Sequence, residues 1–360
     1  MVARVVLVGA GHAHVSLLRK EMKKSVREAE WMLISPSRYQ YYSGMYAGFI
    51  EGLYSEPEIR IDVKRLCEKA GIRFIEDAVS QLYPQRKELH TEGGSVVSYD
   101  LLSFNIGSSA AWEHVPGAEQ YAHTIKPTHR LPTVVQQVKG AKNLAIVGGG
   151  AAGVEVAFAF QSYNEKHGSY QTTSLLTKGE IMEDLREEDK ALLKNELERA
   201  GVQLYEQAAV KEMTPSSLIT RQEKIPYDKA IWLAGSGAPP LFANADLAGE
   251  DGFLPVKHTL QSIEDPDIFG AGDCITVQSH PDLPKNGVYA LSHTPVLHEN
   301  LLRRLRRHSL RPYRPQERYL AIISLGKRKA LLLYGGRSFI GRLSWRLKDR
   351  IDTRFMKKFK

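Results

Sequence analysis

Two glycine turns in the chain have the residue types and spacing that bind a dinucleotide. The first contains Gly9 and Gly11, the second contains Gly148, Gly150 and Gly153, and each directly follows a short apolar run. In such a turn the first glycine permits the bend, the second lets the backbone approach a pyrophosphate, and the third allows close packing of helix on strand. The amides of the following helix then face the anion. The two copies predict two dinucleotide-binding units.

A third glycine turn, late in the chain, carries an acid. Gly272 and Asp273 follow a short apolar run, and an acid at the carboxyl end of a strand lies where ligands bind in open α/β sheets. The Asp273 carboxylate would accept hydrogen bonds from the hydroxyls of a flavin's ribityl chain. The alternative is an ordinary turn capped by Asp273, because Asp favours such positions in any case.

Strands and helices alternate around these turns. This alternation predicts an α/β fold with two Rossmann-like dinucleotide-binding domains. The predicted elements are strands at 31–34 and 174–176 and helices at 15–24, 63–70 and 154–160.

Neither of these two strands ends in the acid that often holds an adenosine ribose. The first ends at Ser35, so adenosine would be held by Ser35, Arg38 or backbone groups. The second ends at Thr177 and is followed by Lys178, with Glu180 nearby. Lys178 either favours the 2′-phosphate of NADPH or is a solvated lysine at a strand end. The choice between NADH and NADPH therefore stays open.

His14 stands where the third glycine of the first turn is expected. A side chain of this size either displaces the following helix or places its imidazole beside the phosphates. His12 and His14 would then donate to an anion or, as a second option, carry protons close to the flavin. A metal held by this His-x-His pair is disfavoured because no carboxylate or cysteine accompanies it. No metal site is predicted.

Length and composition narrow the class of protein. The chain has 360 residues, 42% of them hydrophobic and 25% charged, which is typical of a globular protein with two or three domains. Its two cysteines exclude a disulfide framework and favour a reducing compartment. The start of the chain does not read as a signal peptide, and no apolar run is long enough to cross a bilayer. We therefore expect a cytoplasmic protein.

The net charge of +8 conceals a strong asymmetry. Residues 301–360 contain 19 Lys and Arg against 3 Asp and Glu, so the rest of the chain is acidic. Within 342–360, Leu343, Leu347, Ile351, Phe355 and Phe359 recur every four residues, which predicts an amphipathic basic helix.

This helix could bind an anionic membrane surface through residues 342–360. The alternatives are packing on its own domain or at the interface of a homodimer. Nucleic acid is disfavoured because the sequence contains no recognisable binding module.

Taken together, an N-terminal GxG, a central GGGxxGxE and a late FGAGD resemble the flavoproteins that have two dinucleotide-binding domains. Among these the chain is similar to the type II NADH dehydrogenase-like, FAD-dependent pyridine nucleotide-disulfide oxidoreductases. In particular it resembles the flavoprotein module that is fused to selenide, water dikinase in some bacteria. The resemblance covers essentially the whole chain and is carried by residues 11–15, 41–52, 284–301 and 322–331. It implies an FAD-binding domain over 1–116 and 252–314, an NAD(P)H-binding domain over 117–251, and a membrane-facing C-terminal segment over 315–360.

The resemblance also implies roles for particular residues. Glu155, in GGGxxGxE, would lie near nicotinamide and flavin and take part in substrate binding or proton movement; the alternative is a glutamate that merely complements the helix dipole. Lys126 resembles a family lysine that can pair with that glutamate. The segment with Tyr289 and Ala290 would lie beneath the isoalloxazine ring. It lacks the Ala-Gln pattern at which the family's quinone docks, so the acceptor is in doubt.

The function that follows is an FAD-dependent NAD(P)H dehydrogenase at the inner face of the cell membrane. Hydride would pass from nicotinamide C4 to flavin N5, and electrons would pass on to a quinone-like acceptor. One alternative is a reductase for sulfur or selenium species or a redox protein; another is a slow-turnover flavin sensor or scaffold. Cys67 and Cys274 are not spaced as the reactive pair that disulfide reductases or sulfide:quinone reductases need, which favours hydride transfer without thiols.

Overall fold

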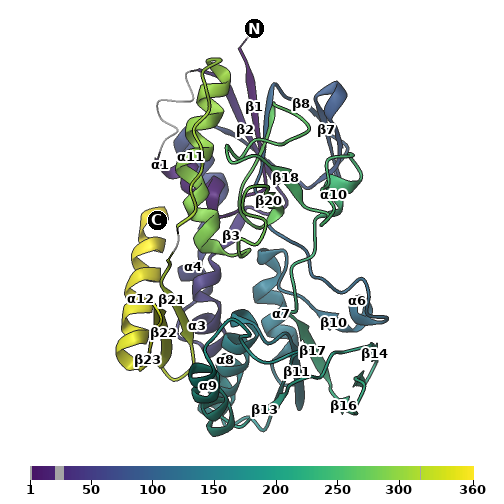
Figure 1. Cartoon of the computed structure of the whole chain (residues 1–360), viewed down its shortest axis with the longest axis vertical. Coiled ribbons are helices and arrows are strands. Elements are labelled where there is room, and N and C mark those ends of the chain that lie inside the picture. Colours follow the sequence, from purple (N-terminus) through teal and green to yellow (C-terminus); the bar gives the residue numbers. More distant parts are fainter. Residues whose placement is uncertain (1, 21–27, 317) are drawn as a thin grey trace.

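Two parallel sheets form the frame of the molecule, as seen in a computed structural model that describes residues 2–20, 28–316 and 318–360. The strand order of the first sheet is β19 (Ile268–Gly270), β9 (Leu101–Phe104), β1 (Arg4–Val8), β2 (Glu30–Ser35) and β5 (Arg73–Glu76). The order of the second is β10 (Ala122–His123), β17 (Lys229–Trp232), β11 (Asn143–Val147), β12 (Thr172–Leu176) and β13 (Val202–Tyr205). The second sheet is inserted into the chain between β9 and β19, and the two units lie one above the other in Figure 1.

Helices cover these sheets, which is why the central strands are unbroken apolar runs. In the first unit α1 packs against both α11 and α5, and in the second α8 packs against β11 and β12. α3 also packs against α8, so the two units are in direct contact. The main helices are α1 (His12–Lys20), α3 (Tyr46–Glu51), α5 (Val63–Ala70), α7 (Leu131–Val138), α8 (Ala151–His167), α9 (Glu187–Arg199) and α11 (Gly287–Leu305).

Smaller sheets and short helices accompany the two large sheets. The additional strands are β3 (Tyr39–Tyr41), β4 (Arg60–Asp62), β6 (Val79–Tyr83), β7 (Glu88–Thr91), β8 (Val96–Ser98), β14 (Glu212–Thr214), β15 (Ser217–Ile219), β16 (Lys224–Pro226), β18 (Leu254–Val256) and β20 (Ile275–Val277). The short helices are α4 (Glu56–Ile59), α6 (Ala118–Tyr121) and α10 (Pro240–Ala243).

The predicted elements are present, with shifts at their ends. The helix expected at 63–70 coincides with α5, and the one expected at 154–160 is longer than predicted. The helix expected at 15–24 begins three residues earlier, as α1, and its positions 21–24 lie outside the described residues. Helix ends are hard to place from sequence because the last turn depends on capping and tertiary contacts.

The C-terminal segment forms a unit of its own. An antiparallel sheet of β21 (Ala321–Ser324), β22 (Ala330–Tyr334) and β23 (Arg337–Gly341) leads into α12 (Arg342–Met356). α12 packs on β22, and β21 packs on α8, so this yellow segment lies along one side of both units (Figure 1). Within the described parts of the chain, none of the helices combines the length and apolarity needed to cross a bilayer.

The second glycine turn shows why α8 can begin directly at the end of β11. Gly148 has φ +131°, a conformation that favours glycine. A Cβ placed on Gly153 would lie far inside van der Waals distance of the Gly148 carbonyl oxygen. The helix can therefore approach the strand this closely only without a side chain at position 153.

We expect Gly153→Ala to lower the free energy of unfolding by about 1–3 kcal/mol, because the added methyl forces the backbone apart. Gly287→Ala is the matched control. Gly287 is in the first turn of α11, and a Cβ there would have its nearest contact, His12 Nε2, at an ordinary 3.7 Å. Denaturant unfolding of both variants tests this. Equal stability of the two variants would contradict the packing argument.

Candidate functional site

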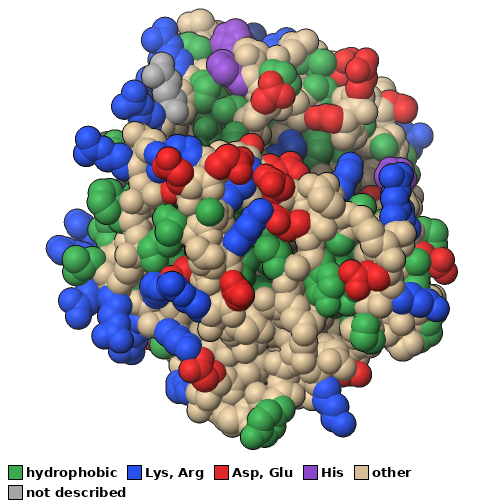
Figure 2. All heavy atoms as spheres, turned by 60° about the horizontal axis from the view of Figure 1, so that its bottom comes forward, with side chains coloured by type: hydrophobic (Ala, Val, Ile, Leu, Met, Phe, Trp, Pro, Cys, Tyr) green, Lys and Arg blue, Asp and Glu red, His purple; other side chains and the backbone are tan. Residues whose placement is uncertain are grey.

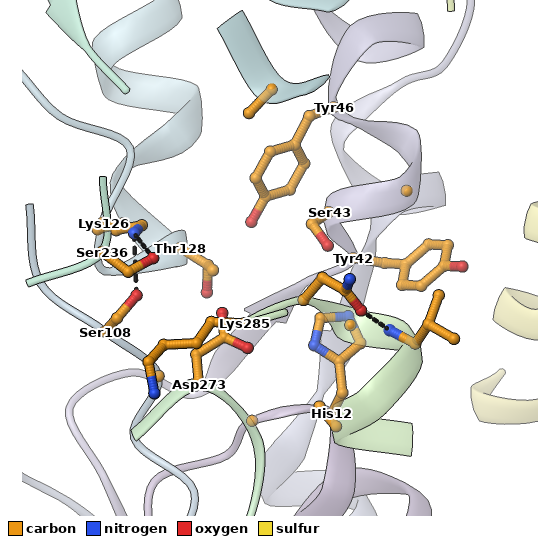
Figure 3. Close-up of a pocket in the computed structure, with 18 of the residues that line it drawn as sticks. His12, Tyr42, Ser43, Tyr46, Ser108, Lys126, Thr128, Ser236, Asp273 and Lys285 are labelled. Atoms are coloured by element: carbon orange, nitrogen blue, oxygen red, sulfur yellow. Dashed lines mark hydrogen bonds between the residues drawn. The ribbon is translucent and has the colours of Figure 1, made fainter. Parts of the chain in front are cut away.

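A cavity of about 1700 Å³ lies where the two units and the C-terminal segment meet. Both glycine turns, the loops after several strands, and residues of β22 and α12 line it. Single-ligand pockets are usually about 300–1,000 Å³, so this cavity has room for more than one ligand of nucleotide size. Figure 3 shows a part of its wall.

The second glycine turn presents an uncapped helix end to the cavity. Gly150, Ala151 and Ala152 line the wall. Gly150 is the N-cap of α8 and makes no side-chain cap hydrogen bond, and the position of its absent Cβ is open space. The first amides of an α-helix lack intrahelical partners. This end of α8 therefore fits the phosphates of a dinucleotide.

The first glycine turn is built differently from its prediction. Gly9 and Gly11 line the cavity, but the amides of Ala13 and His14 donate to Oδ1 of Asn105, at 2.9 and 3.2 Å. Two of the amides at the start of α1 that were expected to face an anion therefore already have a partner within the protein. Asn105 was missed in the sequence, although a polar residue directly after a buried strand is a usable signal.

His14 does not line the cavity, which differs from the prediction that its imidazole lies beside the phosphates. Its ring is fully buried outside the cavity wall and contacts the Gly9 carbonyl oxygen at 2.7 Å and Ser103 Oγ at 2.9 Å. The imidazole thus connects the turn to β9 at the position of the missing glycine. His12 does line the cavity and is close to Gly287, so the two histidines are in separate surroundings.

The two residues predicted to hold adenosine in the first unit have different positions. Ser35, at the end of β2, lines the cavity. Arg38 does not, because its guanidinium pairs with Asp62 at 2.7 Å, and Asp62 is also the N-cap of α5. Of the alternatives predicted to hold adenosine, the structure thus places Ser35 and not Arg38 on the cavity wall. In the second unit, Glu180 is held by Lys190 at 2.6 Å.

Lys126, Asp273 and Lys285 form a charged group on one wall of the cavity, opposite His12 in the view of Figure 3. Lys126 Nζ donates to Ser108 Oγ at 2.9 Å and to Ser236 Oγ at 3.3 Å. Burial raises the pKa of Asp273, although Lys126 and Lys285 act to lower it. This carboxylate and the backbone of the first turn fit the hydroxyls and pyrophosphate of a flavin dinucleotide.

Glu155 lines the cavity on α8 but does not pair with Lys126, which corrects that expectation. Glu155 Oε1 accepts from the Ser324 amide at 2.7 Å, and its nearby cation is Lys348 of α12. Lys348 and Asp352 also line the cavity. Sequence reasoning missed both, because it considered only the apolar stripe of this helix.

Residues around the start of α11 differ in whether they line the main cavity. Ala290 lines the main cavity, whereas Tyr289 and Gly272 border a small separate void of about 20 Å³. Of the two residues predicted to lie beneath a flavin, the structure thus places Ala290 and not Tyr289 on the wall of the main cavity. The Gly272 amide donates to His293 Nδ1 at 3.0 Å, so Gly272 and His293 shape the turn that carries Asp273.

The cysteines are buried free thiols. Burial raises the pKa of Cys67 to about 12 and that of Cys274 to about 11, so both are protonated at neutral pH. Neither lines the main cavity. A thiol that is neither ionised nor accessible is a poor nucleophile, which favours chemistry without thiols.

Fold and site define a flavoprotein oxidoreductase with two dinucleotide-binding units. The chain belongs to the family described as pyridine nucleotide-disulphide oxidoreductase, which matches residues 3–293. It is an oxidoreductase, with FAD as the cofactor typical of the family and NAD(P)H as substrate.

Individual relatives are distant. The chain is 22% identical over 396 residues to a probable NADH dehydrogenase of Dictyostelium discoideum, covering 95% of this chain and 84% of that protein. Two solved structures show the same fold. One is the sulfide:quinone oxidoreductase of Aquifex aeolicus (TM-score 0.81, 17% identity, 99% and 91% of the chains), and the other is NDH2 of Plasmodium falciparum in complex with NADH (TM-score 0.79, 14% identity, 100% and 98%).

His14 should make the protein sensitive to acid. Burial lowers its pKa to about 4, so in the unfolded chain it binds a proton at higher pH than in the folded protein. Its contribution to stability is therefore present above the unfolded pKa of about 6.5 and is lost as the pH falls, by about 2 kcal/mol between pH 7.5 and 5. His12 and His293, whose pKa values are also lowered to about 4, contribute in the same direction.

We expect His14→Gln to reduce the pH dependence of the free energy of unfolding between pH 7.5 and 5. The exposed His114 provides a control, His114→Gln, which should keep the wild-type dependence. Urea unfolding at both pH values measures the difference. An unchanged slope in His14→Gln would show that this histidine is not held neutral.

Proposed function

We propose that the protein is an FAD-dependent NAD(P)H dehydrogenase that passes electrons to a quinone-like acceptor at a membrane surface, on the cytoplasmic face of the cell membrane. FAD, when bound, accepts a hydride from NAD(P)H and passes two electrons to the acceptor. One observation carries the proposal. The cavity is continuous from both glycine turns to the C-terminal segment, so donor, flavin and acceptor would share one space.

The chain's own residues bind and orient the reactants in this proposal. The uncapped start of α8 holds the phosphates of NAD(P)H, and Glu155 lies one turn further along the same helix. Gly9, Gly11, Ser35 and Asp273 line the cavity and would hold the flavin dinucleotide. Most of the rate enhancement would come from placing the two rings together and excluding water, since the cofactor supplies the reactive atoms.

The far end of the cavity supports an apolar acceptor. Leu333 and Tyr334 of β22 and Ile351 of α12 line it there. Tyr334 and Ile351 are also exposed to solvent, so this wall continues onto the protein surface. Similarity to a sulfide:quinone oxidoreductase does not favour sulfide as the donor, because Cys67 and Cys274 are buried and apart from the cavity.

The surface of α12 supports the membrane assignment. Leu343, Leu347 and Ile351 are 77%, 40% and 41% exposed, whereas Phe359 at the end of the predicted stripe is buried. Exposed basic residues flank this part of the helix, and Figure 2 shows Lys and Arg side chains with hydrophobic ones between them on that side of the molecule. An exposed apolar stripe with basic neighbours suits an anionic lipid headgroup layer. The exposed basic residues of the helix and the turn after it are Arg342, Arg346, Arg350, Arg354, Lys357 and Lys358.

We expect anaerobic NADH or NADPH to bleach the visible absorbance of bound flavin, and a soluble quinone such as menadione to restore it. Stopped-flow absorbance measures both half-reactions, and the two nucleotides compared at equal concentration give the coenzyme preference. A flavin that neither nucleotide reduces would make the dehydrogenase proposal wrong.

We expect the triple variant Leu343→Ser, Leu347→Ser, Ile351→Ser to bind anionic vesicles at least tenfold more weakly. Loss of even about 1.4 kcal/mol of apolar burial is tenfold in affinity, and each of these side chains can contribute about that much. Leu192→Ser is the matched control, because Leu192 is 47% exposed on α9, away from the stripe. Vesicle flotation measures binding. Equal flotation of the triple variant and the control would show that α12 does not bind the membrane.

A further inference from the structure

A polar cluster occupies the wall of the cavity on the inner side of α12. Asp352 Oδ1 accepts from the Tyr42 hydroxyl at 3.0 Å, and Asp352 Oδ2 accepts from Lys348 Nζ at 2.9 Å. Lys348 also donates to the Gly44 carbonyl oxygen. Tyr42, Gly44, Lys348 and Asp352 all line the cavity. In Figure 3 the Tyr42 hydroxyl points away from His12, toward the yellow ribbon of the C-terminal segment.

The charges in this cluster do not balance if every group is ionised. Lys348 pairs with Asp352 and also acts electrostatically on Glu155 of α8, so one ammonium group lies near two carboxyl groups. The side chains of Lys348 and Asp352 are 13% and 7% exposed, and an unbalanced negative charge at such a site is costly. A proton held on one of the two carboxyl groups would reduce this cost.

The directions of the pKa shifts agree with this excess of carboxyl groups over ammonium groups. Burial raises the pKa values of Asp352 and Glu155, although Lys348 acts to lower both. Burial acts to lower the pKa of Lys348, but Glu155 and Asp352 raise it. These shifts favour the charged form of the ammonium group and the protonated form of the two carboxyl groups. Tyr42 stays neutral because burial and Asp352 raise its pKa.

The groups that face Asp352 come from several elements. Tyr42 precedes the first turn after β3, Lys348 and Asp349 are on α12 itself, and Glu155 is on α8. Asp349 accepts from Tyr54 at 2.6 Å and does not line the cavity. The same helix thus carries two Tyr–Asp hydrogen bonds, of which only Tyr42–Asp352 borders the cavity.

We propose that Asp352, hydrogen-bonded to Tyr42 and sharing Lys348 with Glu155, holds the proton that reduction of the acceptor consumes. This rests on the proposed function. In the overall reaction NAD(P)H, one proton and the acceptor yield NAD(P)⁺ and the acceptor reduced by two electrons and two protons. The hydride carries both electrons and one proton. The second proton comes from the Asp352–Glu155 pair and is replaced from water.

The test separates proton transfer from electron transfer. The flavin of the FAD-loaded protein is reduced with dithionite, so that the result does not depend on NAD(P)H, and is then oxidised by either menadione or ferricyanide. Menadione takes up two protons with two electrons, whereas ferricyanide takes one electron and no proton. We expect Asp352→Asn to slow oxidation by menadione at least tenfold and to leave oxidation by ferricyanide within twofold of wild type.

The pH profile gives a second readout. In wild type the menadione rate should fall as the pH rises through the raised pKa of the carboxyl pair, since only the protonated pair donates. Tyr42→Phe should keep this profile at a lower rate, whereas Asp352→Asn should lose it. Asp349→Asn is the matched control: it should keep the rate and the pH dependence, with the profile displaced to lower pH because the Asp349 carboxylate helps to raise the pKa of Asp352.

Infrared titration of the cofactor-free protein tests the proton itself. We expect a protonated-carboxyl stretching band at neutral pH that weakens in Asp352→Asn and persists in Asp349→Asn. The proton role is overturned if this band is the same in both variants, or if menadione and ferricyanide rates fall together in Asp352→Asn. Failure of NAD(P)H to reduce the flavin would instead count against the proposed function.

Discussion

The close approach of Gly153 to the Gly148 carbonyl oxygen is the contact on which the second unit depends. It lets α8 start directly at the carboxyl end of β11 and directs the unpaired amides of that helix into the cavity. Glu155 follows one turn later on the same helix, so its position on the wall is a consequence of the same contact. One backbone constraint thereby positions both the phosphate-binding end and the acidic side chain.

The first unit reaches a similar arrangement by other means. His14 occupies the place of the third glycine, and its ring connects the Gly9 carbonyl to Ser103 on the neighbouring strand. Asn105 satisfies amides at the start of α1 and donates to the Ala271 carbonyl oxygen at 2.6 Å. Side-chain hydrogen bonds thus replace backbone packing, and they also connect the first glycine turn to the late turn that carries Asp273.

One side of α12 faces the cavity and the other side is exposed to solvent. Its Lys348 and Asp352, one turn apart, face the cavity, while Leu343 and Leu347 are exposed on the outside. The helix is therefore amphipathic in an unusual sense, with a charged inner side and an apolar outer one. Buried charges of this kind are retained only where other groups compensate them. Lys348 pairs with Asp352, the Tyr42 hydroxyl donates to Asp352, and Glu155 of α8 favours the charged form of Lys348. The cluster exists only because all three parts of the molecule meet.

Much of the fold could be predicted from the sequence, because glycine turns after apolar runs are local features with a local cause. The same holds for α5, whose apolar and capping residues lie within ten positions of one another. Roles that depend on a distant partner could not be predicted. Arg38 is held by Asp62, and Lys126 is held by serines rather than by Glu155.

The sequence by itself determined the α/β class, the two dinucleotide-binding turns and the basic, amphipathic end of the chain. Only the tertiary structure decided which polar side chains share the cavity. Asn105, Lys348 and Asp352 become recognisable when β9 and α12 are placed against the glycine turns. The physical reason is that backbone turns and amphipathic patterns are encoded within a few residues, whereas burial and charge pairing depend on residues far apart in the chain.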